Sequence, residues 1–81
     1  MTRTEILKKI TEVLADVLDN DKLQLTEATT ADSVENWDSI NHVRMLIALE
    51  SDYGFQFETD EVGGVKDVGG LIDLVQSRLA K

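Results

Sequence analysis

The sequence of 81 residues contains no cysteine and no proline, and its aromatic residues are one tryptophan, one tyrosine and two phenylalanines. Without cysteine, disulfides, thiol catalysis, thiolate-bound zinc and iron–sulfur clusters are excluded. The absence of proline favours helices, because every backbone N–H can donate. No apolar run approaches the roughly 18 residues of a membrane span, and no apolar segment typical of a signal peptide opens the chain. We therefore expect a cytoplasmic, monomeric protein held together by helix packing.

Basic residues are scarce in the middle of the chain. The net charge is −8, from 16 acidic and 8 basic residues. Between Leu23 and Val65 there are nine acidic residues and one strong base, Arg44, so this segment carries the whole net charge. Such a protein repels nucleic acid and anionic lipid. The charge pattern leaves two interpretations open, a basic protein partner that docks on the middle of the chain and a surface that is simply well solvated.

The length corresponds to a single domain over residues 1–81, and 42% hydrophobic residues are enough for a core. Apolar residues spaced three and four apart predict helices over residues 3–18, 39–51 and 68–79. A short helical turn is expected at 59–62. The sequence thus predicts an all-α fold, a small antiparallel bundle of three main helices plus one short helix.

Several polar residues mark the expected helix ends. Thr2 and Glu5 have the spacing of a capping box, and Asp38 and Asp67 precede helices as N-caps. Asn20 is placed as the left-handed residue that ends the first helix. In the second helix, the residues expected to form the buried stripe are Ile40, Val43, Leu46, Ile47 and Leu49. That choice of face puts Arg44 toward solvent.

The loop between the first two helices, residues 19–38, is unusually long for a compact domain and must be anchored. Trp37 is expected to be a buried plug and not a ligand-stacking residue. The other residues expected to anchor this loop to the helices are Leu23, Leu25 and Val34. Beyond the second helix, F-Q-F at 55–57 is interpreted as an extended connector with one phenylalanine buried, because the sequence offers no partner strand.

Candidate catalytic and metal-binding residues are few. Ser39 and His42, the only histidine, share a helix face. A nucleophilic pair also needs an orienting group, an oxyanion hole and a pocket, for which a domain of this size has little material. The acidic clusters lack the spacing and the glycine of a calcium loop, and no P-loop or dinucleotide motif occurs. We expect neither catalysis nor a bound metal.

The tetrapeptide W-D-S-I at 37–40 joins the long loop to the second helix. Ser39 is the one serine that follows an acid and precedes a strongly apolar helix. A phosphate on its hydroxyl would meet free N–H groups and the positive end of the helix dipole. Asp38 together with Mg²⁺ is suited to hold a pyrophosphate leaving group. From the residues alone, a phosphodiester-linked Ser39 and an ordinary pair of capping residues both remain open.

The segment D-S-I-N-H-V-R-M-L-I-A-L-E-S-D-Y-G-F-Q-F resembles the acyl carrier protein family, and the resemblance covers nearly the whole chain. It implies a 4′-phosphopantetheine arm on Ser39, transferred from coenzyme A by a phosphopantetheinyl transferase that recognises the adjacent Asp38. It also implies a non-catalytic carrier of acyl thioesters. An acyl-loading ligase or transferase would charge the arm, and ketosynthases or other acyl-processing enzymes would receive the tethered group at high effective concentration.

The same resemblance implies two further sets of residues. Those expected to contact partner enzymes are Ile40, Asn41, Arg44, Met45 and Glu50. Those expected to line an acyl cleft in the core are Leu46, Ile47, Leu49, Phe57, Val62, Val65 and Leu71. Ordinary core packing explains the second set equally well.

The second helix departs from the pattern of housekeeping carriers, which show a nearly unbroken acidic face there. Asn41, Arg44 and Ser51 interrupt that face here. The departure indicates a specialised free-standing carrier of a secondary-metabolite, polyketide-like or surface-glycan pathway, in place of bulk fatty-acid synthesis. Two alternatives stay open: an aminoacyl or peptidyl carrier loaded by an adenylating ligase, which Ile40 and the acidic middle disfavour, and a helical adaptor without a prosthetic group.

Overall fold

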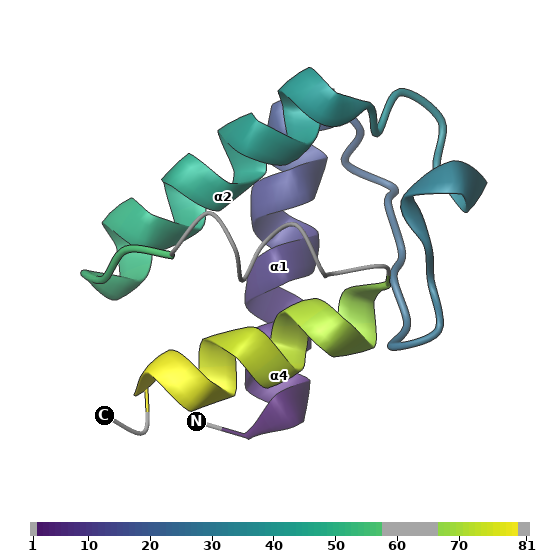
Figure 1. Ribbon diagram of the computed structural model, residues 1–81. Coiled ribbons are helices and arrows are strands. Elements are labelled where there is room, and N and C mark those ends of the chain that lie inside the picture. The colour runs from purple at the N-terminus through teal and green to yellow at the C-terminus, as the bar shows by residue number, and fades with distance from the viewer. Residues whose placement is uncertain (1, 58–66, 80–81) are drawn as a thin grey trace.

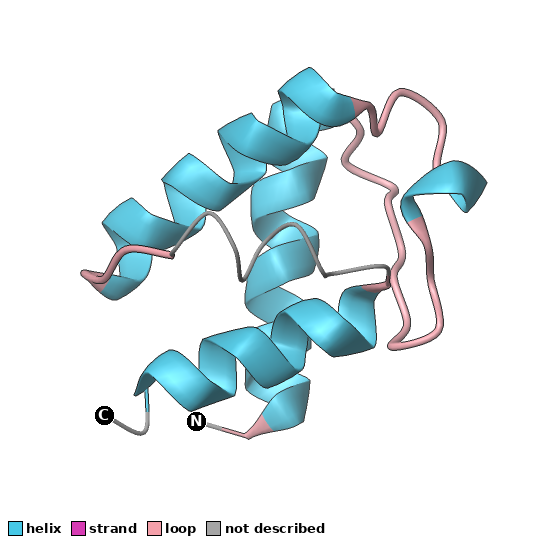
Figure 2. Ribbon diagram, in the orientation of Figure 1, coloured by secondary structure: helices cyan, strands magenta, loops and turns pink. Residues whose placement is uncertain are grey.

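The structure is a computed structural model that describes residues 2–57 and 67–79. These residues form three α-helices, α1 (Arg3–Leu18), α2 (Ser39–Tyr53) and α4 (Val68–Leu79), and one 3₁₀ turn, η1 (Ala31–Ser33) (Figure 1). Helix α1 packs against both α2 and α4. Figure 2 shows helices and loops but no strand in this part of the chain, which confirms the predicted all-α class. The helical turn predicted at 59–62 lies outside the described residues.

The helices begin at the predicted caps. The Thr2 hydroxyl accepts a hydrogen bond from the Glu5 N–H at 3.1 Å, and the Glu5 carboxylate accepts one from the Thr2 N–H at 3.1 Å. The carboxylates of Asp38 and Asp67 each accept from the N–H three residues further on, at 2.9 and 2.7 Å. Three helix starts are therefore fixed by local side-chain chemistry that is visible in the sequence.

The helix ends differ slightly from the prediction. Helix α1 is terminated by its C-cap Asp19, which has a left-handed φ of 53°. The assignment of the left-handed position to Asn20 is therefore wrong. The short polar side chain of aspartate tolerates this conformation. Helix α2 continues to Tyr53, beyond the predicted Ser51, and ends where Gly54 adopts a φ of 76°. The apolar periodicity that continues to Tyr53 explains the extra half turn.

The core lies where the three helices and the long loop meet. Helix α4 buries Val68, Leu71, Ile72 and Val75, whereas its last residue, Leu79, is 37% exposed. Leu25 and Trp37 are buried and Leu23 and Val34 pack partly against the core, so the predicted anchoring of the loop is confirmed. The buried set is Ile6, Ile10, Val13, Leu14, Leu25, Trp37, Met45, Leu46, Leu49, Val68, Leu71, Ile72 and Val75.

Helix α2 buries only part of the predicted stripe: Leu46 and Leu49 lie in the core as predicted. Its buried residues are Met45, Leu46 and Leu49. The prediction that Ile40, Val43 and Ile47 belong to the core is wrong, because these side chains are 65%, 52% and 59% exposed. We call these three residues the α2 apolar stripe. Both sets have helical spacing and lie on opposite sides of one helix, so packing against α1 decides which set is buried.

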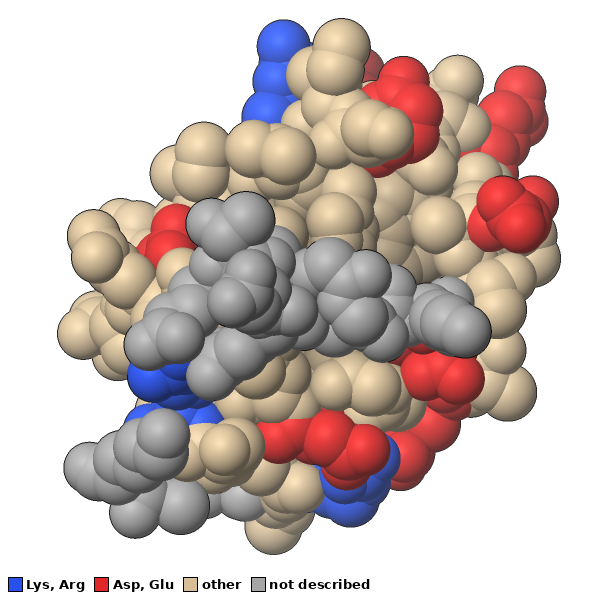
Figure 3. Space-filling model, in the orientation of Figure 1, with Lys and Arg blue, Asp and Glu red and all other residues tan. Residues whose placement is uncertain are grey.

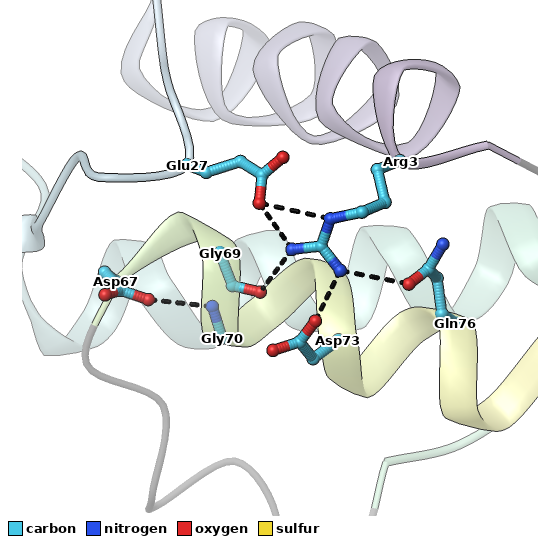
Figure 4. A network of polar contacts seen from close by, with 7 residues as sticks. All are labelled: Arg3, Glu27, Asp67, Gly69, Gly70, Asp73 and Gln76. Atoms are coloured by element: carbon cyan, nitrogen blue, oxygen red, sulfur yellow. Dashed lines mark hydrogen bonds and ion pairs between the residues drawn. The ribbon is translucent and has the colours of Figure 1, made fainter.

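A guanidinium ties the long loop to two helices (Figure 4). Arg3 donates from Nε to Glu27 at 3.1 Å, pairs with Asp73, and donates to Gln76 at 3.0 Å and to the Gly69 carbonyl at 3.4 Å. The Gly69 N–H in turn donates to the Glu27 carbonyl at 2.8 Å. A Cβ at Gly69 would lie 3.0 Å from that carbonyl oxygen, so the two backbones pack closely at this glycine.

Candidate functional site

Ser39 is the first residue of α2, and its side chain is exposed. The cap of the helix is the preceding Asp38, one of whose carboxylate oxygens accepts from the Asn41 N–H at 2.9 Å. Within residues 2–57 and 67–79, the Ser39 hydroxyl has no hydrogen-bond partner. It is therefore free to react, while the backbone that carries it is held by the cap of the helix.

The backbone before Ser39 is tied to the helix that follows it. Asn36 adopts a left-handed φ of 69°, and its carbonyl accepts hydrogen bonds from the Asp38 N–H at 3.0 Å and from the Asn41 side-chain amide at 2.8 Å. The His42 N–H donates to the Asp38 carbonyl at 2.8 Å. Ser39 thus lies in a short segment whose two ends are bonded to each other.

A second contact crosses the same junction. The Trp37 indole N–H donates to Nδ1 of His42 at 3.1 Å, and the two rings stack with centroids 5.9 Å apart. Trp37 is 7% exposed, which confirms the prediction of a buried plug. Burial lowers the pKa of His42. Because Nδ1 accepts the indole proton, His42 is neutral and carries its own proton on Nε2. Nδ1 of His42 is therefore bonded to Trp37 and not to Ser39.

An open hollow lies beside Ser39 on the outer face of α2. It has a volume of about 430 Å³ and is lined by Ser39, Ile40, Val43 and Arg44. Arg44 is exposed, as predicted, and makes no ion pair with any described residue. Figure 3 shows acidic side chains on this view over the long loop and near the start of α2. The hollow therefore combines an apolar floor, from Ile40 and Val43, with one cation, Arg44.

The residues predicted to contact partners do not share one surface. Ile40 and Arg44 are exposed. Asn41 is partly buried and its amide is used within the chain. Glu50 is also partly buried, and it accepts a hydrogen bond from the Phe57 N–H at 2.8 Å. Met45 is fully buried, so its assignment to a partner surface is wrong.

The residues predicted to line an acyl cleft also separate. Leu46, Leu49 and Leu71 are buried in the core, and Phe57 is half-buried. Ile47 lies on the opposite side of α2 and is 59% exposed, so its assignment to an interior cleft is wrong. Val62 and Val65 lie outside the described residues, and a cleft in this region stays a prediction.

Sequence reasoning missed the two contacts that cross the junction around Ser39. The pairs Asn36–Asn41 and Trp37–His42 are each five residues apart and join a loop to a helix, so no helical or strand periodicity predicts them. In the described part of the chain, no group of three or more acidic or histidine side chains is placed to bind a metal ion. No helix described here is long and apolar enough to cross a membrane.

The fold and the site define a small helical domain with an exposed serine at the start of α2. No family model matches the sequence. The acyl carrier protein of Lactobacillus acidophilus is 32% identical over 77 residues, which cover 95% of this chain and 96% of that protein. The acyl carrier protein of Thermosynechococcus vestitus is 31% identical over 81 residues, which cover 99% of each.

A solved structure agrees with these sequence matches. The solution NMR structure of a holo acyl carrier protein from Geobacter metallireducens is 36% identical to this chain, with a TM-score of 0.84. The match covers 91% of this chain and 85% of that one. The chain therefore belongs to the acyl carrier protein family.

Proposed function

We propose that this protein carries acyl groups as thioesters on a 4′-phosphopantetheine arm attached to the hydroxyl of Ser39. The observation that carries the proposal is the exposed Ser39 hydroxyl, which has no partner in the described residues and stands at the start of α2 beside an open hollow. The residues fit the group, because a phosphodiester here meets the helix N-terminus and the Arg44 side chain lines the same hollow. When attached, the arm supplies the thiol that forms the thioester.

The role of Ser39 in its own modification is that of an acceptor. Its Oγ forms a bond to the pantetheine-bearing phosphorus of coenzyme A, the bond from that phosphorus to adenosine 3′,5′-bisphosphate breaks, and the hydroxyl proton passes to the transferase. One carboxylate oxygen of Asp38 is occupied by the Asn41 N–H. The other is available to a Mg²⁺ ion brought by the transferase, which matches the chemistry of a pyrophosphate leaving group.

The proposal is tested by mass. The purified apo-protein is incubated with coenzyme A and a phosphopantetheinyl transferase of broad specificity, and its intact mass is measured. We expect a gain of one phosphopantetheine, and peptide fragmentation should place it on Ser39. No gain in mass, or a gain mapped to Ser33, Ser51 or Ser77, would contradict the proposal.

We further propose that the partner enzymes belong to a specialised acyl pathway and dock on the α2 apolar stripe. Two observations support this. The stripe is exposed and continuous with the hollow at Ser39. Arg44 is the one strong base between Lys22 and Lys66. A partner that reads acidic helices with basic residues would meet Arg44 as a like charge, and such repulsion is a means of discriminating between partners.

The Arg44→Glu variant is therefore expected to react faster with a housekeeping ketosynthase that has a basic docking surface. At low ionic strength the acyl-transfer rate should rise about three- to tenfold, and the gain should shrink as salt is added. Lys8→Glu, which makes the same change in charge on an exposed position of α1, is the matched control and should give little gain. Equal rates for wild type and Arg44→Glu, or an equal gain in Lys8→Glu, would contradict this role. Asn41 stays unchanged in the experiment, because its amide binds the Asn36 carbonyl.

A further inference from the structure

Two side-chain hydrogen bonds join the residues before Ser39 to the residues after it. The Asn41 amide donates to the Asn36 carbonyl at 2.8 Å, and the Trp37 indole donates to the His42 imidazole at 3.1 Å. We propose that these four residues, the Ser39 brace, are positioning residues that hold Ser39 in the orientation needed for phosphopantetheine transfer. The inference rests on the proposed function and names residues outside Asp38 and Ser39 on which the reaction depends.

Burial gives the brace its rigidity. Trp37 is 7% exposed, although its neighbours Asn36 and Asp38 are exposed. His42, one turn into α2, is half-buried and stacks on the indole with an angle of 29° between the rings. The segment is thus anchored in the core by Trp37 before Ser39 and bonded to that anchor by His42 after it, while the Ser39 side chain itself remains exposed.

The backbone conformation shows that the segment needs such support. Asn36 has a φ of 69°, in the left-handed region that non-glycine residues adopt at some cost. The side chain of Asn41 stabilises this turn by binding the Asn36 carbonyl. Without the brace the turn is expected to relax, and Ser39 would move with it. A misplacement of about 1 Å can slow a group transfer by up to about 100-fold.

The Trp37–His42 bond requires a neutral imidazole. A proton on Nδ1 would replace the lone pair that accepts from the indole. Burial lowers the pKa of His42, with no contribution from a charged group among the described residues. Along the chain Asp38 and Arg44 are the nearest charged residues, and the Asp38 carboxylate binds the Asn41 N–H. Because the pKa of His42 in the folded state lies below the usual histidine value of about 6.5, the bond is retained at neutral pH and is lost only as the pH falls through that lowered pKa.

The test measures kcat and KM of a phosphopantetheinyl transferase for the apo-protein and its variants. Trp37→Phe keeps the ring and removes the donor, His42→Ala removes the acceptor, and Asn41→Ala removes the amide. In each we expect kcat to fall about tenfold, with KM changed less than about twofold. His42→Asn, whose amide oxygen can take the place of Nδ1, should restore most of the rate and should not lose it at mildly acidic pH.

A spectroscopic signal separates the brace from general stability. The protein has a single tryptophan, so its indole N–H gives one NMR resonance, which should shift in His42→Ala and return toward the wild-type position in His42→Asn. The control is Thr2→Ala, which removes one helix cap at the other end of the molecule in Figure 1. It should lower the Tm without changing kcat.

The outcomes are distinct. A wild-type kcat in Trp37→Phe and His42→Ala would overturn the brace, and so would a fall in kcat for Thr2→Ala as large as theirs. A wild-type protein that gains no mass at all would overturn the proposed function itself.

Discussion

The Ser39→Ala variant is expected to gain no phosphopantetheine and to keep the fold of the wild type. The loss of phosphopantetheine should be complete, because neither Ser33 in the long loop nor Ser51 near the end of α2 lies at the start of a long helix. The fold should be retained for three reasons. Ser39 is not the cap of α2, its hydroxyl has no partner in the described residues, and alanine is a strong helix former. Intact mass measures the first expectation, and far-UV circular dichroism and thermal melting measure the second.

Matched serine variants make this result specific. Ser33 lies in η1 and donates its hydroxyl to the Thr30 carbonyl at 2.7 Å, whereas Ser51 is exposed near the far end of α2. Ser33→Ala and Ser51→Ala should both gain the full mass of one phosphopantetheine. The free energy of unfolding of Ser39→Ala should stay within about 0.5 kcal/mol of the wild-type value, as is usual for surface substitutions. A mass gain in Ser39→Ala, or its loss in Ser51→Ala, would assign the attachment to another residue.

The features that could be predicted from the sequence are those fixed by neighbouring residues. The three helices begin at the predicted caps, because a cap depends on an N–H only a few residues away. These caps are the Thr2–Glu5 box, Asp38 and Asp67. The exposed position of Ser39 follows from Asp38 being the cap. The anchoring of the loop through Trp37 follows from the need to bury a large aromatic side chain, and the sequence has only four aromatic residues.

The Ser39 brace could not be predicted, because it depends on backbone geometry that periodicity does not reveal. The Asn41 amide reaches the Asn36 carbonyl only because Asn36 turns into the left-handed region. An asparagine at the second position after Ser39 is equally compatible with a solvent-exposed contact for a partner, which is how the sequence alone presents it. The contact of His42 could not be predicted either, because its imidazole accepts a hydrogen bond from the indole of Trp37, five residues earlier in the loop.

Ile40, Val43 and Ile47 were wrongly assigned to the buried face of α2 for a different reason. Two apolar stripes share the helical spacing, one with Ile47 and one with Met45, and hydrophobicity does not rank them. The packing of α2 against α1 decides which stripe enters the core, and that information lies outside the α2 sequence itself. The stripe left outside runs from Ile40, next to Ser39, to Ile47, and this position is the reason for proposing it as the docking surface for partners.

Replacement of Met45 by alanine is expected to destabilise the protein far more than replacement of Ile47. The two residues have the same number of side-chain heavy atoms and lie on one helix, but Met45 is fully buried and Ile47 is 59% exposed. Truncation of a buried methionine costs about 2–5 kcal/mol, because it removes apolar burial and leaves a cavity. That is a large share of the roughly 5–15 kcal/mol that holds a domain together. Ile47→Ala should stay within about 0.5 kcal/mol, which urea unfolding followed by circular dichroism can measure.

For acyl transfer to a partner, in contrast to stability, Ile47→Ala should have the larger effect of the two variants. At a temperature where both variants are folded, Met45→Ala should accept acyl groups from a partner enzyme as wild type does, since its side chain does not reach the surface. Ile47→Ala should be loaded at Ser39 normally and then transfer more slowly to a partner, because it removes apolar area from the α2 apolar stripe. Equal losses of stability would show that the wrong face of α2 has been assigned to the core. A wild-type transfer rate in Ile47→Ala would show that partners dock elsewhere than on this stripe.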